Sequence, residues 1–142
     1  MRLSITTIAV TLAVVATTAA GVQAAVQAAG AAPPVTKLKH PQFGNVLARP
    51  DRQALYYWKV EKIDFKVHCT GSCARAWPPL IVRSRAAVPR TVPGIKGVFG
   101  VVRRPDGRLQ LTRNRLPMYT YAHERPGQVL CDNVDGWFVV RV

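Results

Sequence analysis

The chain has 142 residues and a formal net charge of +13, with 20 Lys and Arg against 7 Asp and Glu. This length allows one small domain with a modest core. The positive charge favours anionic partners. The basic residues are scattered, however, and no nucleic-acid-binding motif lies among them, so we expect no nucleic-acid partner.

Residues 1–24 have the order of a secretory signal peptide. Arg2 gives the positive charge, an uncharged apolar stretch follows from Ile5 to Ala20, and residues 22–24 (VQA) form a small-x-small cleavage site. Cleavage would leave 19 basic and 7 acidic residues, a net charge of +12. An uncleaved membrane anchor is the alternative, but no basic stop-transfer flank follows. We therefore expect a periplasmic or secreted protein with no stable membrane span after cleavage, of unknown oligomeric state.

Two further segments complete the expected organisation. Residues 25–39 are rich in Ala, Pro and Val and are predicted to form a flexible tether. Residues 40–142 are predicted to form the folded domain. Short β-rich runs separated by Pro, Gly and Asp predict strands over residues 45–48, 54–60, 80–82, 98–103, 108–112, 117–122 and 137–142.

Helical periodicity is almost absent from this domain. One helical turn is predicted from Ser72 to Trp77, with Ser72 as its cap and Pro78-Pro79 ending it. The predicted fold class is therefore all-β, a single small domain of two pseudo-repeats.

The pseudo-repeats rest on two recurring patterns. Arg-Pro-Asp occurs at residues 49–51 and again at 104–106, and each is followed by an aromatic group, LYYW at 55–58 and MYTY at 118–121. If the two Arg-Pro-Asp motifs are equivalent, the second copy carries eight extra residues, enough for one more hairpin strand.

Each aromatic group is followed by a glutamate, Tyr56 by Glu61 and Tyr119 by Glu124. Strand alternation places Tyr56 with Trp58, and Tyr119 with Tyr121, on one face. Buried tyrosine hydroxyls need partners, so we interpret the glutamates as structural acceptors. Trp77 is predicted to fill the core, with Pro78-Pro79 stiffening the chain after it, and the alternative is an exposed ligand platform. Trp137 begins the last predicted strand and is counted among the structural residues.

These stretches resemble the bacterial secreted-repeat family, predicted lipoproteins and exported proteins with a Tyr-x4-Asp motif. The similar segments span nearly the whole domain: LYYWKVE (55–61), CTGSCARAWPPL (69–80), RPDGRLQL (104–111), PMYTYAHE (117–124) and DGWFVV (135–140). The resemblance implies an exported β-rich module and narrows location and fold more than activity.

The chain departs from that family in three ways. Glu61 and Glu124 stand at the motif aspartates, no lipidation cysteine follows the signal segment, and Cys131 lies where a Gly/Asp-rich loop is usual. A soluble exported form is therefore favoured over a lipid-anchored one. The loop around Cys131 is a poor candidate for a calcium site.

The cysteines Cys69, Cys73 and Cys131 allow three single disulfides, each leaving one thiol. Outside the cytoplasm a disulfide is expected to persist, and we favour the local Cys69–Cys73 pair. The alternative is a metal or electron-handling site of His68, Cys69 and Cys73, because imidazole and thiolate suit copper or zinc. The order of these residues is wrong for haem attachment. We expect no cofactor.

No catalytic set is recognisable. Ser72 lies near His68 in sequence but lacks a Gly-x-Ser-x-Gly turn. A carboxylate pair for glycoside cleavage would have to be Glu61 and Glu124, whose symmetric placement structural repetition explains equally well. We therefore expect a non-enzymatic exported module whose basic surface binds an anionic envelope component or an acidic protein.

Overall fold

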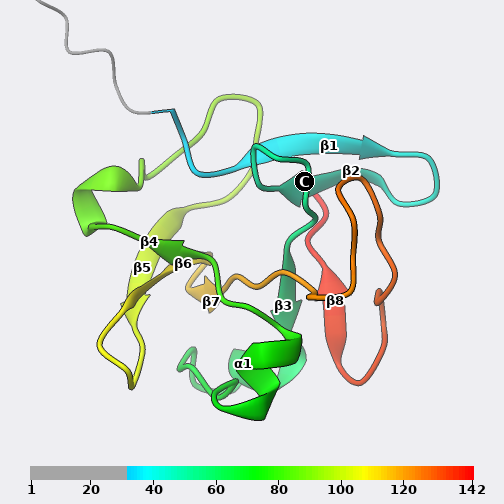
Figure 1. Ribbon diagram of the computed structural model, residues 1–142. Helices are drawn as coiled ribbons and strands as arrows, with labels where there is room; N and C mark the ends of the chain where they lie inside the picture. Colours follow the sequence, from blue (N-terminus) through cyan, green and yellow to red (C-terminus); the bar gives the residue numbers. More distant parts are fainter. Residues whose placement is uncertain (1–31) are drawn as a thin grey trace, which may run out of the picture.

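The computed structural model of the protein describes residues 32–142 (Figure 1). The predicted signal peptide and residues 25–31 of the predicted tether lie outside this range. The described part is strand-dominated, which confirms the all-β prediction. Its strands are β1 (Thr36–His40), β2 (Gly44–Ala48), β3 (Tyr56–Trp58), β4 (Ile81–Val82), β5 (Phe99–Arg103), β6 (Leu109–Arg113), β7 (Leu116–Pro117) and β8 (Trp137–Val139).

The predicted start of the folded domain was too late. β1 begins at Thr36, inside the segment predicted as a tether, and Val35 before it is only 2% exposed. The alternation of Leu38 with Lys37 and Lys39 is a strand pattern, which the Ala- and Pro-rich composition of the preceding residues concealed. Residues 36–39 therefore belong to the domain.

Three short helical segments interrupt the strands: η1 (Lys59–Lys62), α1 (Ser72–Ala76) and η2 (Arg85–Ala87). α1 lies where the helical turn was predicted, but Ser72 is not its cap. Gly71 takes the N-cap position with φ 56°, a left-handed conformation that glycine adopts at little cost. No helix in residues 32–142 combines the length and apolar character needed to cross a membrane.

The strands form three small antiparallel sheets, β1–β2, β3–β8 and β4–β6–β5, with β7 also paired to β6. In Figure 1 the β5–β6 hairpin lies on the opposite side of the molecule from β8. Two halves emerge, residues 36–82 (the first half) and 99–142 (the second half). Each half gives its last strand to the other, because β4 pairs with β6 and β8 pairs with β3.

Matched backbone hydrogen bonds establish that the halves are related by a pseudo-twofold axis. Leu47 N–H donates to Val140 O (2.7 Å), and Leu111 N–H donates to Leu80 O (2.8 Å). Four further bonds, all 2.9 Å long, form two more matched pairs. The Leu55 N–H donates to Leu47 O as the Met118 N–H does to Leu111 O. The Val140 N–H donates to Leu55 O as the Leu80 N–H does to Met118 O. The equivalent residues are therefore Leu47 and Leu111, Leu55 and Met118, and Leu80 and Val140.

This equivalence corrects the predicted repeat alignment. The turn at residues 49–52 joins β2 to the run that leads into Tyr56, and its counterpart is the Asn114-Arg115 turn before β7. The Arg-Pro-Asp at 104–106 instead joins β5 to β6. Both motifs make the same local turn, since Arg49 N–H donates to Gln53 O and Arg104 N–H donates to Arg108 O. The motif thus repeats a turn type, and the second copy carries no eight-residue insertion.

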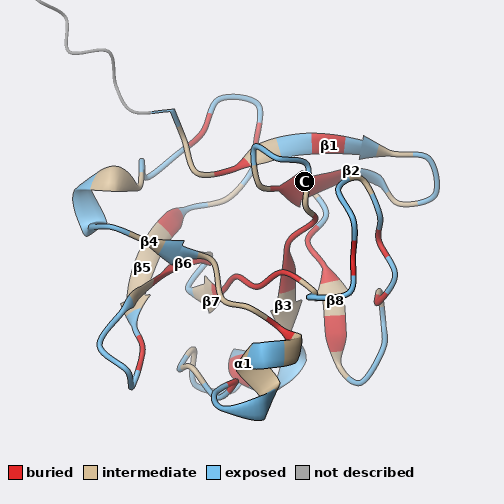
Figure 2. Ribbon diagram, viewed as in Figure 1, coloured by how far each residue is buried: buried red, intermediate tan, exposed pale blue. Residues whose placement is uncertain are grey.

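Buried residues, red in Figure 2, occur in both halves. They form two core clusters, and both halves contribute to each. One cluster is mainly aliphatic and contains the equivalent pairs Leu47 with Leu111 and Leu55 with Met118. The other is aromatic and contains Tyr56, Tyr119, Trp77 and Trp137. Because the cores are shared, we expect the halves to fold as one unit.

Candidate functional site

Tyr56 and Tyr119 face each other across the pseudo-twofold axis. The N–H of each donates to the C=O of the other, at 2.8 and 2.9 Å, and both residues are fully buried. This reciprocal pair fixes the two aromatic strand units in register. The expected pairing of two such units around one core is therefore present in the described residues.

The glutamates accept hydrogen bonds from the tyrosine of the opposite half. The Tyr119 hydroxyl donates to Glu61 Oε1 (2.7 Å), and the Tyr56 hydroxyl donates to Glu124 Oε1. The Tyr and the Glu of one sequence motif therefore do not bond each other; each bonds its counterpart in the other half. Because each pair joins the halves, the motif locks them together.

Backbone groups complete both acceptor sites. Glu61 Oε1 also accepts the N–H of His68 (2.8 Å) and of Cys69 (3.3 Å), whereas Glu124 Oε1 accepts the N–H of Leu130 (2.7 Å). Each carboxylate therefore organises the loop that follows it. The structural role expected for both glutamates agrees with this geometry.

Burial raises the pKa of Glu61 and of Glu124 above the ordinary glutamate value, although their hydrogen bonds act in the opposite direction. Burial and the neighbouring carboxylates also raise the pKa of Tyr56 and Tyr119, so both hydroxyls keep their protons and donate. The second oxygen, Oε2, of each glutamate is buried without a partner among the described residues. Solvent and substrate do not reach these oxygens in this conformation.

An aromatic stack crosses the axis beside the tyrosines. Trp77 and Trp137 are parallel with centroids 3.9 Å apart, and each presents its edge or face to one tyrosine, Tyr56 at 5.3 Å and Tyr119 at 5.1 Å. Trp58 stacks on Trp137, and Tyr121 packs against Trp77 with its ring tilted by 34°. All six predicted aromatic residues thus meet in one cluster.

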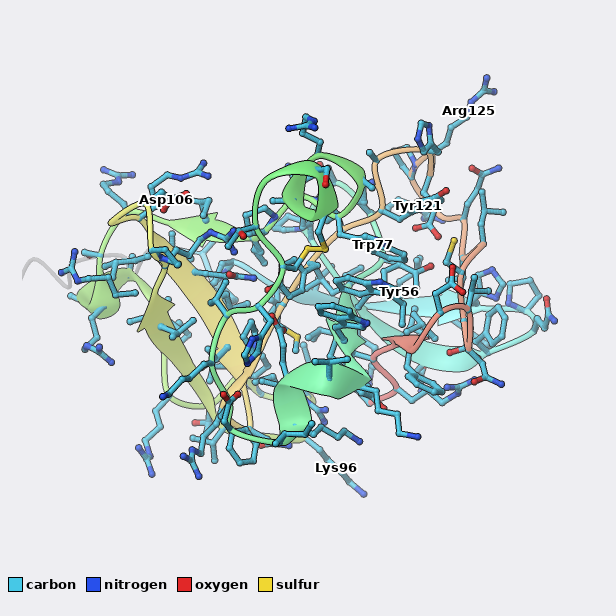
Figure 3. The ribbon with its side chains drawn as sticks, turned by 90° about the horizontal axis from the view of Figure 1, so that it is seen from below. Tyr56, Trp77, Lys96, Asp106, Tyr121 and Arg125 are labelled. Carbon is cyan, nitrogen blue, oxygen red and sulfur yellow. A yellow bond between two sulfur atoms is a disulfide. The ribbon has the colours of Figure 1, made fainter. Side chains whose placement is uncertain are left out.

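The labelled residues in Figure 3 show the position of this cluster. Tyr56, Trp77 and Tyr121 lie together, while Arg125 extends away from them. Tyr57, which lies between Tyr56 and Trp58 in β3, points away from the cluster and stacks on Phe138, with ring centroids 5.6 Å apart. Strand alternation therefore separates the side chains as expected.

The cysteines occupy related positions with different chemistry. Cys69 and Cys73 form a disulfide, whereas the buried Cys131 is free. Burial and the Glu124 charge raise the pKa of Cys131, which disfavours its reactive thiolate. His68 Nε2 lies 3.0 Å from Asp64 Oδ1. Within residues 32–142, no group of three or more His, Cys, Asp or Glu side chains is arranged to hold a metal ion.

Arg104, the first residue of the second Arg-Pro-Asp motif, is buried and only 3% exposed. Its Nη2 donates to Cys69 O (2.9 Å), and its Nη1 donates to the side chain of the buried Gln110. Gln110 in turn donates to Met118 O (2.8 Å). Neither residue had a sequence signal for burial, because Arg104 belongs to a turn motif and Gln110 lies in an alternating strand.

The remaining charges are strongly unbalanced. All the basic residues except Arg2 lie in residues 32–142, and only four of these 19 form ion pairs there: Arg49, Arg104, Arg108 and Arg141. Fifteen lysines and arginines are therefore without an acidic partner in the described part. Of the seven acidic residues, Glu61 and Glu124 are buried and four aspartates are paired, which leaves Asp135.

Two adjoining hollows of about 340 and 350 Å³ lie along β5 and share Val102. We call them the β5 groove. Its floor includes residues 98–102. Asp64 and Phe65 line one hollow, and Lys66 and Val67 line the other. Its exposed cations are Lys66, Arg85, Arg90, Arg103 and Arg115, and its one acidic residue is Asp64, which pairs with His68.

We compared the chain with protein-family profiles, with curated proteins and with solved structures, and none of the three comparisons gave a match.

Proposed function

We propose that this protein is an exported, non-enzymatic binding module whose basic surface binds an anionic component of the bacterial envelope or an acidic protein. The observation that carries the proposal is the charge imbalance. Fifteen basic side chains have no acidic partner in the described residues, and both glutamates are committed to buried tyrosines. A surface of this kind attracts anions over distances set by ionic strength.

Export is supported by three features. The first 24 residues have the order of a signal peptide, and the chain resembles an exported family. The Cys69–Cys73 disulfide is of the kind that persists outside the cytoplasm. Intact mass of the protein from its own host tests this proposal, because cleavage after Ala24 shortens the chain by a defined mass.

Binding to immobilised heparin and to vesicles with anionic lipid tests the anionic partner. We expect retention at about 50 mM salt and release at several-fold higher salt, because screening weakens interactions between exposed charges. Zwitterionic vesicles serve as the control. Failure to bind either anionic surface at low salt would remove the proposal.

Thiol counting separates this function from the metal-binding alternative through His68, Cys69 and Cys73. That alternative needs two reduced cysteines, whereas the disulfide leaves Cys131 as the one free thiol of the chain. We expect one thiol per denatured, unreduced chain and no stoichiometric metal. Three thiols together with bound copper or zinc would favour the alternative.

A further inference from the structure

The outer edge of β5 has unpaired backbone groups. Asn114 N–H donates to Val98 O, and Arg104 N–H donates to Arg108 O, so even-numbered positions of β5 face β6. In an antiparallel pair the alternate residues face outward. Phe99 N–H does so and donates to Arg90 O (2.9 Å). Beyond it, Phe99 C=O, Val101 N–H and C=O, and Arg103 N–H have no hydrogen-bond partner among the described residues.

This open edge lies in the β5 groove, among the exposed cations described above. Arg85 and Arg90 come from the segment that precedes β5, and Arg115 comes from the turn after β6. The Arg115 guanidinium lies 4.1 Å from the centre of the Phe65 ring, which holds this cation at the groove. Strand-pairing groups and positive charge thus occur in the same place.

We propose that the β5 groove binds an extended acidic segment of a partner protein, which adds to the sheet as a strand beside β5. The inference deepens the proposed function and rests on it, since it names one partner class and one surface. Backbone hydrogen bonds to Val101 hold the segment, and its carboxylates pair with Arg85, Arg90 and Arg115. A sugar phosphate or lipid surface would use the charges but leave the strand edge unpaired.

Charge also decides against a second copy of this chain. Two β5 edges brought together would place their arginines against each other, and like charges across an interface are unfavourable. The outer edge of β1 differs, because Lys37 and Lys39 stand at its outward-facing positions. Lysines at such positions oppose the addition of a strand. In β5 the apolar Val101 stands where β1 has Lys37. Arg103, the counterpart of Lys39, stands at the end of β5, so the middle of the β5 edge carries no blocking charge.

Fluorescence anisotropy with the labelled peptide Ac-(Glu-Val)4-amide tests this inference on the purified protein at low salt. We expect saturable binding that the charge reversals R85E/R90E weaken about tenfold or more. R52E/R125E is the matched control, because it changes the net charge equally and both residues are exposed outside the groove. We expect this control to weaken binding about threefold or less.

Two peptide variants test the strand pairing itself. N-methylation of the valines removes one set of backbone donors, and N-methylation of the glutamates removes the other, with charge unchanged in both. Alternation predicts that only one of the two peptides loses affinity, about tenfold or more.

The remaining outcomes are distinct. Equal loss in both charge variants, with no effect of N-methylation, overturns strand addition and leaves the proposed function standing. Peptide-independent dimers that dissociate when Val101 is replaced by proline would assign the edge to a second copy and also overturn the inference. If the unmodified protein binds neither heparin nor the acidic peptide, the proposed function fails with it.

Discussion

The two halves of the domain agree at the pseudo-twofold axis and differ at their outer positions. At the axis, Tyr56 and Tyr119 make the same contacts, as do Trp77 and Trp137. Outside it, the first half has a disulfide where the second has the free Cys131. The outer strands also differ, since Lys37 stands in the middle of the β1 edge and Val101 stands at the corresponding place on the β5 edge. Shared positions therefore hold the fold, and the proposed binding surface lies where the halves differ.

Removing either central tryptophan tests the shared part with the largest expected effect. We expect W77A and W137A each to lower the free energy of unfolding by about 3–5 kcal/mol, because each leaves a cavity in the aromatic cluster. Urea unfolding followed by circular dichroism measures this loss. W58A, which removes a half-buried ring at the outer end of the stack, is the control and should cost clearly less. A large loss for only one central tryptophan would contradict the equivalence of the halves.

The crossed tyrosine–glutamate pairs give the next effect. Replacing Tyr56 or Tyr119 with phenylalanine leaves a buried carboxylate short of one donor, which should cost about 1.5–3 kcal/mol. Y56F should cost more, because Glu124 keeps only the Leu130 N–H while Glu61 keeps two backbone donors. Urea unfolding measures both.

Y57F is the matched control for this pair, because the Tyr57 hydroxyl makes only a 3.4 Å contact with Lys62 and is not in the core network. We expect its effect to stay within about 0.5 kcal/mol. Equal effects of Y56F, Y119F and Y57F would argue against the crossed pairs.

The sequence was sufficient to predict the strand-rich fold and the aromatic residues of the cluster, because alternation and turn residues are local signals. It could not predict which Tyr meets which Glu. Tyr56 is five positions from Glu61 but bonds Glu124, and this choice depends on how the halves exchange β4 and β8. Tertiary pairing of this kind leaves no trace in local spacing.

Arg-Pro-Asp misled the repeat alignment for a related reason. The motif favours a turn, and both copies make that turn, but the turns connect strands that are not equivalent. Local identity therefore indicated a local shape and was wrong about the register of the halves. The burial of Arg104 escaped prediction as well, because its acceptors are Cys69 O and the Gln110 side chain, both supplied by folding.

We expect the smallest effect on stability from a change of pH. Burial raises the folded-state pKa of Glu61 and Glu124 above the ordinary value of 4.5, so ionising them opposes folding. Their contribution to stability is therefore greatest below pH 4.5 and is lost as pH rises through the folded-state pKa values. The exposed Asp64 and Asp106 act in the opposite direction, since hydrogen bonds lower their pKa and their contribution is lost only in stronger acid.

We therefore expect Tm to rise as pH falls from about 7 to about 5. In E61Q/E124Q this slope should flatten, because the amides do not ionise in that range and their carbonyl oxygens still accept the tyrosine hydroxyls. D64N should keep the slope and serves as the control. Thermal unfolding followed across this pH range measures all three proteins. A wild-type Tm that stays constant or falls towards pH 5 would mean that the two glutamates are better solvated than their burial indicates. The single variants E61Q and E124Q would then show which of the two glutamates behaves differently.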